Sequence, residues 1–264
     1  MIAKGHTSAA AAAAATLLLL LPVLLASAQD APAPKKVLPS YVPVCKRKDA
    51  DLSGCVRRAV ETLRPRLRKG ISRLRVQPLE PFTLPALRVE RDLPALRVNA
   101  SLADIHVDGA SDFRIQKLRV DPENLMVSGE VLLPLLRVKC KYAISGRLLT
   151  VPLQGRGNFY GNFSDVLVTA TGRGKRSNEG GVDHAIATSI NLRMRLGGAK
   201  VDFDNEDPDS AAAANAALSF VRSNTDAVLE VVTPVAEETA EEVALQMINN
   251  IFMRLPFNEI LPDA

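Results

Sequence analysis

Large aromatic side chains are scarce in this sequence, and tryptophan is absent from it. Phe, Tyr and Trp together account for 4% of the 264 residues, whereas hydrophobic residues account for 47%. The interior must therefore consist mainly of Leu, Val, Ile and Ala, and the chain is long enough to bury a sizeable core in one or two domains. Because small aliphatic side chains on two facing layers can leave space between them, an apolar cavity and a fully packed core both remain open.

Residues for metal or acid–base chemistry are also sparse. The histidines that follow the N-terminal region, His106 and His184, have no second ligand at metal-binding spacing. The sequence contains no H-E-x-x-H, C-x-x-C or G-x-S-x-G motif. We therefore predict a protein that is not an enzyme and that uses no metal and no cofactor. An enzyme acting on lipophilic substrates is the weakest alternative.

The first 28 residues have the composition of a signal peptide. Lys4 precedes an apolar run over residues 9–25, and Ala26-Ser27-Ala28 supplies small residues for cleavage. We expect removal of residues 1–28 and a secreted, extracellular protein, with a retained membrane anchor as the alternative. Residues 29–44 are rich in Pro, Ala and Lys and are predicted to be a flexible lead-in to one domain over residues 45–264.

Cysteine is limited to three residues, which an exported protein can oxidise. Cys45 and Cys55 flank a short polar segment, and we predict a disulfide between them. Cys140 is left over and alternates with Val138 and Tyr142, which favours a buried, inert thiol. An intermolecular bridge and a reactive thiol are the alternatives.

The charge is unevenly distributed. The formal net charge is +4, but basic residues crowd between Lys46 and Arg75, whereas the C-terminal region is acidic. Two solvated faces of one molecule are the simplest interpretation, and docking to a membrane or an acidic partner is the alternative. Nucleic acid is not an expected partner, because the basic run lacks interleaved aromatic residues and the chain is predicted to be exported.

Between Asn99 and Phe203 apolar residues recur at every second position, which predicts antiparallel strands with one apolar face. Two glycosylation sequons in this region, at Asn99 and Asn162, are predicted to be exposed. From Ala211 to Leu255 the apolar period is instead that of an α-helix. The expected fold class is therefore α+β, with a curved sheet wrapping this helix.

Two details of the C-terminal helix follow from its sequence. Pro234 lies inside the periodic pattern, so we expect a kink or break there. The carboxylates expected on the solvated side of the helix are Glu237, Glu238, Glu241 and Glu242.

Several segments, in order along the chain, are similar to one known family. They are the Cys45/Cys55 pair before a helix, Leu102–Gly109 with Phe113-Arg114-Ile115, Tyr142–Leu149 leading into Val151–Gly157, Asn162–Val166, the long helix with Asn215, Asn224 and Pro234, and the closing segment Leu255–Leu261. The mature chain thereby resembles the insect takeout and juvenile-hormone-binding protein family (haemolymph juvenile hormone binding protein-like) over nearly its whole length. Since Cys140 alone cannot form the second disulfide of the hormone-binding branch, the takeout-like branch matches better, and juvenile-hormone specificity is not carried over.

The resemblance implies a long C-terminal α-helix wrapped by a highly curved antiparallel sheet that encloses a hydrophobic tunnel. It also implies a secreted, non-catalytic carrier of a small hydrophobic ligand such as a terpenoid, a fatty-acid-like or quinone-like compound, or an odorant. We expect a monomer. The alternative is an interaction module that docks to a membrane, a receptor or another acidic partner through its basic N-terminal region.

We predict that two sets of residues line the tunnel, and that Tyr142 contributes a polar contact. The helical set is Val228, Val232, Val235, Met247, Ile251 and Phe252. The strand set is Leu133, Val138, Tyr142, Ile144, Phe159, Phe163, Ile190, Leu192 and Met194.

Overall fold

The computed structural model describes residues 38–263, which belong to one compact unit. The predicted signal peptide and residues 29–37 of the predicted lead-in lie outside the described residues. Within residues 38–263, no helix combines the length and the apolar character needed to cross a bilayer.

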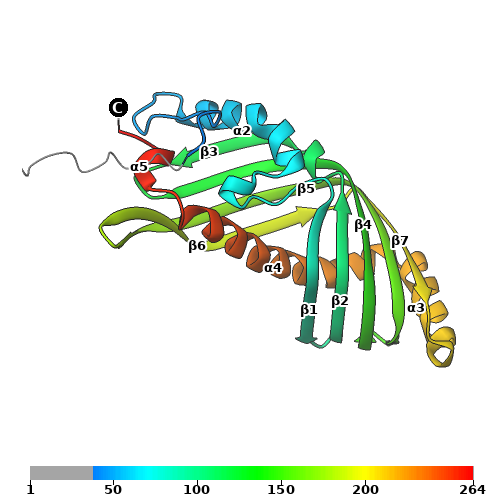
Figure 1. The fold of residues 1–264 in the computed structure, drawn as a ribbon. Coiled ribbons are helices and arrows are strands. Elements are labelled where there is room, and N and C mark those ends of the chain that lie inside the picture. The colour runs from blue at the N-terminus through cyan, green and yellow to red at the C-terminus, as the bar shows by residue number, and fades with distance from the viewer. Residues whose placement is uncertain (1–37, 264) are drawn as a thin grey trace, which may run out of the picture. The chain divides into compact units, whose positions relative to one another are not determined.

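A seven-stranded antiparallel sheet forms the main layer (Figure 1). Its strands are β1 (Phe82–Asp92), β2 (Leu96–Asp108), β3 (Arg114–Asp121), β4 (Met126–Leu148), β5 (Val151–Glu179), β6 (Val182–Arg195) and β7 (Gly198–Asn205). The central order is β1-β2-β4-β5-β6, with β3 also paired to β4 and β7 to β5. Because β4 and β5 are long, each changes its outer partner along its length, and the sheet has two halves that share these strands.

The two halves meet at an interruption of the β4–β5 ladder. Leu133 pairs with Val166 and Leu135 pairs with Ser164, but the residues between them, Pro134 and Asp165, do not pair. Pro134 has no N–H to donate, and Asp165 has a φ of 49°. Figure 1 shows both strands curving along their length, so that the sheet wraps partly around the C-terminal helices.

The C-terminal region forms two consecutive helices, α3 (Ala211–Ser223) and α4 (Thr225–Phe252), followed by the short α5 (Phe257–Ile260). The prediction of a kink or break at Pro234 was wrong about the break, which lies at Asn224 instead. Asn224 has φ −133° and ψ 39°, and its side-chain amide donates to the Phe220 carbonyl at 3.0 Å. An Asn side chain can bond to the local backbone in place of the helical ladder, which is why the helix is interrupted there.

Helix α4 is fastened to the edge strand β6 by side chains that bond to the strand's backbone. Glu237 accepts the N–H of Met194 at 2.6 Å, and Glu241 accepts the N–H of Leu192 at 2.7 Å. Asn249 both accepts from the N–H of Ala187 and donates to its carbonyl. These contacts satisfy backbone groups that an edge strand otherwise leaves unpaired.

The same contacts correct the expectation that all four acidic residues of this helix are solvated. Glu237 is only 7% exposed and Glu241 is half-buried, whereas Glu238 and Glu242 are exposed. The helix lies against a sheet edge as well as a sheet face, so a carboxylate beside its apolar stripe can reach the β6 backbone.

Helix α2 (Leu52–Lys69) lies beside β3 (Figure 1). The predicted disulfide is confirmed: Cys45 and Cys55 are bonded, with a Cα–Cα distance of 5.9 Å. Asp51 caps the helix by accepting the N–H of Gly54 at 3.0 Å, while the hydroxyl of Ser53 accepts the N–H of Val120. The bridge and the Ser53 contact thus fix the start of α2 relative to the preceding loop and to β3.

The N-terminal loop of the described region also meets the end of the chain. The backbone N–H of Leu38 donates to Glu259 at 2.7 Å, and Arg47 pairs with Asp263 at 2.7 Å. Phe257, 3% exposed, has the guanidinium groups of Arg47 and Arg176 within 4.8 Å and 4.6 Å of its ring centroid. A small separate core forms here from Leu38, Ile71, Leu74 and Leu255.

Candidate ligand-binding cavity

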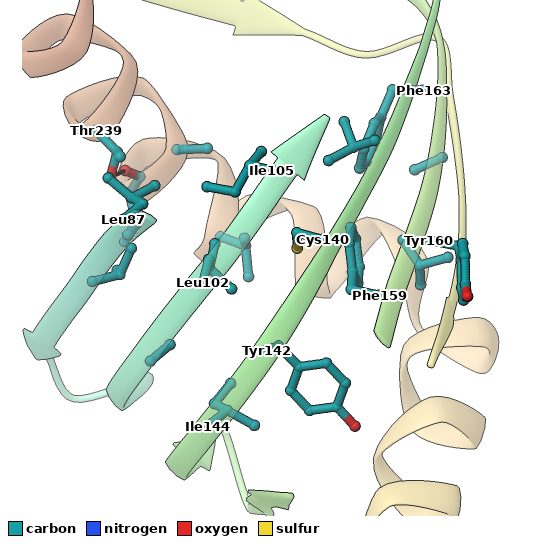
Figure 2. Close-up of a pocket in the computed structure, with 18 of the residues that line it drawn as sticks. Leu87, Leu102, Ile105, Cys140, Tyr142, Ile144, Phe159, Tyr160, Phe163 and Thr239 are labelled. Carbon is teal, nitrogen blue, oxygen red and sulfur yellow. Dashed lines mark hydrogen bonds between the residues drawn. The ribbon is translucent and has the colours of Figure 1, made fainter. Parts of the chain in front are cut away.

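An apolar cavity of about 1420 Å³ lies between the sheet and helices α3 and α4. Its sheet wall comes mainly from β1, β2, the C-terminal half of β4, the N-terminal half of β5, and β7. Figure 2 shows Leu102, Ile105, Cys140, Tyr142 and Ile144 of β2 and β4 on this wall. The cavity therefore belongs to one half of the sheet, and the small core near the chain termini belongs to the other end.

The β2 wall depends on a bulge. Even-numbered Leu102 faces the cavity before the bulge, and odd-numbered Ile105 and Val107 face it afterwards. The register with β4 shifts between Ala103 and His106, and Asp104, inside the shift, has a φ of 50°. Side chains alternate between the two faces of a strand, so apolar residues at odd positions would point outward if the even positions continued to point inward. The one extra residue of the bulge turns Ile105 and Val107 back toward the cavity.

The helical wall is built largely from small side chains. Helix α4 presents Ala236, Ala240 and Ala244 to the cavity, between the larger Val235, Val243 and Met247. Helix α3 presents Ala217. Short side chains on the helix cannot fill the space up to a sheet that curves away from them, so a large apolar space remains between the two layers. This pairing of an alanine-rich helix face with a curved sheet accounts for the volume.

The structure brings ten of the predicted lining residues together on the cavity wall. They are Val138, Tyr142, Ile144, Phe159, Phe163, Leu192, Val228, Val232, Val235 and Met247. The remaining five predicted residues, Leu133, Ile190, Met194, Ile251 and Phe252, do not line it.

The positions of these five explain the difference. Leu133 lies beyond the interruption at Pro134. Ile190 and Met194 lie on β6, which pairs with the corresponding half of β5 and reaches the cavity wall through Leu192. Ile251 packs against the small core near the chain termini, and Phe252 is the last residue of α4. Apolar periodicity identifies a buried face but does not show where along that face the packing becomes complete.

The residues that β1, β2 and α3 contribute to the cavity wall were not predicted from the sequence. In β1 and β2 apolar residues alternate at Leu87, Val89, Leu96 and Val98, but the region predicted to form strands began only at Asn99. Of these two strands β1 lies at an edge of the sheet, and β2 lies between β1 and β4.

Two tyrosines, Tyr142 of β4 and Tyr160 of β5, lie on the cavity wall (Figure 2). Tyr160 is 40% exposed, and Tyr142 is the more buried of the two. Its ring packs near Phe203, which also contacts Phe159, at centroid distances of 5.8 and 5.7 Å. Burial, assisted by the negative charges of Asp204 and Glu206, raises the pKa of Tyr142. The hydroxyl therefore stays protonated at neutral pH, and within residues 38–263 it has no hydrogen-bond partner.

Cys140 lies on the same strand and is 3% exposed. Burial raises the pKa of this thiol, so it is protonated and weakly nucleophilic at neutral pH. The position fits the interpretation of an inert buried thiol.

Charged residues occur at the rim of the cavity. Arg222 of α3 pairs with Asp202 of β7 at 3.2 Å, and both side chains are more than half exposed. On the opposite side of the cavity, Arg91 of β1 pairs with Glu238 of α4, also at 3.2 Å. Ionic contacts thus connect the helices to strands at two edges of the apolar wall.

The predicted glycosylation sites, Asn99 and Asn162, are both exposed. Their occupancy remains a prediction. Within the described residues, no group of three or more His, Cys, Asp and Glu side chains has an arrangement suited to a metal ion.

Comparison with known proteins gives a family match and a fold match. A family model described as haemolymph juvenile hormone binding protein matches residues 19–262. The crystal structure of Takeout 1 from Epiphyas postvittana is similar, with a TM-score of 0.65 and 20% identity over 83% of this chain and 99% of that chain. A crystal structure of lipopolysaccharide binding protein gives a TM-score of 0.33 and 13% identity over 76% of this chain and 40% of that one. Among curated protein sequences, none matches this chain.

Proposed function

Because this chain belongs to the haemolymph juvenile hormone binding protein family, we propose that it is a secreted, non-catalytic carrier of a lipophilic small molecule. The guest occupies the cavity between the sheet and helices α3 and α4. The observation that carries the proposal is the apolar cavity of about 1420 Å³.

The dimensions and chemistry of the cavity indicate the class of guest. Ligand pockets usually have volumes of about 300–1,000 Å³, so this one accepts a guest larger than a typical drug-sized molecule. Burial of apolar surface, worth about 25 cal/mol per Å², drives the binding of a long aliphatic or terpenoid chain. After the costs of association, we expect dissociation constants of micromolar order or lower for chains of about 15–20 carbons.

Tyr142 supplies the polar contact in this proposal. Its protonated hydroxyl lacks a hydrogen-bond partner within residues 38–263, so it can donate to an ester, ketone, ether or carboxyl oxygen of the guest. A donor on a mainly apolar wall fixes the orientation of a guest without contributing most of its affinity.

Secretion is part of the proposal. The Cys45–Cys55 disulfide is typical of proteins that fold in an oxidising compartment, and residues 1–28 have the composition of a signal peptide.

The first experiment is native mass spectrometry of the secreted protein, followed by organic extraction and identification of whatever is released. A stoichiometric lipophilic compound supports the carrier function and identifies the class of guest. An empty protein that also fails to take up fatty acids, terpenoids and a fluorescent apolar probe would overturn it.

Replacing Val232 with Trp tests the location of the site. Val232 lies on the cavity wall in α4, so the indole ring should occupy the space of the guest and weaken binding of the fluorescent apolar probe at least about tenfold. The matched control is Val182→Trp, at a position that is 40% exposed on β6. Circular dichroism checks that both variants are folded; unchanged probe affinity in folded Val232→Trp would contradict the placement.

A further inference from the structure

The segment from Lys46 to Arg75 contains eleven Lys and Arg residues and three Asp and Glu residues, a net charge of +8. The whole chain has a net charge of +4, so all other residues together are acidic. This contrast shows that the positive charge is a local property of α2 and the segments next to it. A local concentration of one sign attracts a surface of the opposite sign even when the protein as a whole is nearly neutral.

Most of the charge on α2 is available to a partner. Five cations of the helix are exposed: Arg57, Arg58, Arg66, Arg68 and Lys69. We call these five residues the basic face. Of the basic face, only Arg58 forms an ion pair with another residue in the range 38–263, namely the exposed Asp51 at 3.1 Å. Glu61 pairs instead with Arg64.

The basic face is held in place by contacts to the sheet side of α2. Arg57 donates to the Ile115 carbonyl of β3 at 3.2 Å, and Arg64 donates to the Ser111 and Phe113 carbonyls. Together with the Cys45–Cys55 bridge, these contacts fix the helix. Its cations are therefore presented together and lose little backbone entropy when they bind a surface.

Apolar side chains are exposed beside the basic face. Tyr41 and Val44, in the loop before α2, are each 38% exposed. The guanidinium of Arg66 lies 3.9 Å from the centroid of the Tyr41 ring. Tyrosine next to basic residues is typical of protein segments that lie at the headgroup level of a bilayer. A polyanionic glycan or an acidic protein surface does not require such apolar neighbours.

We propose that the basic face, with Tyr41 and Val44, docks the protein on bilayers that contain anionic lipid headgroups. The choice of a bilayer rests partly on the proposed carrier function, because an apolar guest partitions into membranes and is loaded or released there. The attraction is electrostatic: each Lys or Arg near an anionic surface strengthens binding about fivefold, and added salt screens the attraction.

Sedimentation with vesicles tests the proposal. The full secreted protein is mixed with vesicles of phosphatidylcholine alone, or of equal parts phosphatidylcholine and phosphatidylglycerol, at low and high salt. The test variant is Arg58→Gln/Arg66→Gln/Lys69→Gln, which removes three cations from one side of α2. The control variant, Arg173→Gln/Lys175→Gln/Arg195→Gln, makes the same charge change at exposed positions of β5 and β6.

We expect the protein to bind only the anionic vesicles and to be released by salt. The α2 variant should bind about a hundredfold more weakly, while the control should bind within about threefold of the unmodified protein. Equal losses in the two variants would mean that only net charge matters, and would overturn the proposal. Equal binding to neutral vesicles would also overturn it, as would binding to heparin or an acidic protein with no binding to anionic vesicles.

A parallel titration with a fluorescent apolar probe separates this proposal from the carrier function. Probe binding without vesicle binding would refute the docking surface and leave the carrier function intact. Vesicle binding without probe binding would support the docking surface and count against the carrier function. The α2 variant should bind the probe with unchanged affinity, because none of its three substituted residues lines the cavity.

Discussion

Replacing Glu237 with Ala should destabilise the protein by removing a connection between α4 and the sheet. Its carboxylate accepts the N–H of Met194 at 2.6 Å and contacts Arg193 at 3.2 Å, and the residue is only 7% exposed. A hydrogen bond to a charged group contributes about 1.5–3 kcal/mol, and an abandoned buried donor costs about as much. We therefore expect the free energy of unfolding to fall by about 2 kcal/mol.

Urea denaturation measures this change. With a slope of about 2 kcal/mol per molar, the midpoint should fall by about 1 M at an unchanged slope. The control is Glu238→Ala on the neighbouring residue, whose side chain is 61% exposed and, among the described residues, pairs only with Arg91. Both variants introduce Ala into the same helix, so helix propensity changes equally, and the control should lose less than about 1 kcal/mol. Equal shifts in the two variants, or no shift in Glu237→Ala, would refute the role assigned to the α4–β6 contact.

Two further predictions concern hydroxyl and carboxyl groups. Tyr142→Phe should leave binding of a purely aliphatic probe unchanged, but weaken a long-chain ester or acid about three- to tenfold in a competition titration; equal losses for both would contradict the role of the hydroxyl. For Glu80, burial raises the pKa, but hydrogen bonds from the Gly109 N–H and from Ser111 outweigh it and leave the pKa below the ordinary value of 4.5. Its contribution to stability is therefore complete above that value and is lost as the pH falls through the lower folded-state pKa. Thermal unfolding between pH 7 and pH 3 should show a smaller acid-induced loss for Glu80→Gln than for the unmodified protein, and parallel pH profiles would refute this.

The family and the fold expected from the sequence are confirmed by the family match and by the similarity to Takeout 1. Strand alternation and helical periodicity were sufficient to place Val138, Tyr142 and Val232 on one wall, because both patterns depend on local geometry. The limits of the cavity depend on packing between distant segments. Ile251 has the same helical period as Val232, but it faces a core that includes Leu38, more than 200 positions earlier in the chain.

The burial of Glu237 was not predictable for a related reason. A carboxylate next to the apolar stripe of a helix is usually solvated, and the sequence contains no sign that a sheet edge will lie beside it. Within residues 38–263, β6 pairs with β5 on one side and has no strand partner on the other, so its unpaired N–H groups can donate to Glu237 and Glu241.

The bulge at Asp104 changes which residues of β2 point toward the cavity: even-numbered residues do so before it, and odd-numbered residues do so after it. Before it, the inward frame reads Leu96, Val98, Ala100 and Leu102; after it, the inward frame reads Ile105 and Val107. In the sequence the apolar residues also change from even-numbered to odd-numbered positions at this point, so the sequence pattern matches the bulge in the strand. If the same residues continued in regular pairing without a bulge, the polar His106 and Asp108 would occupy the inward frame, and the wall of an apolar cavity would become a polar surface. The chemical character of the wall thus depends on the bulge in this strand as much as on the types of its residues.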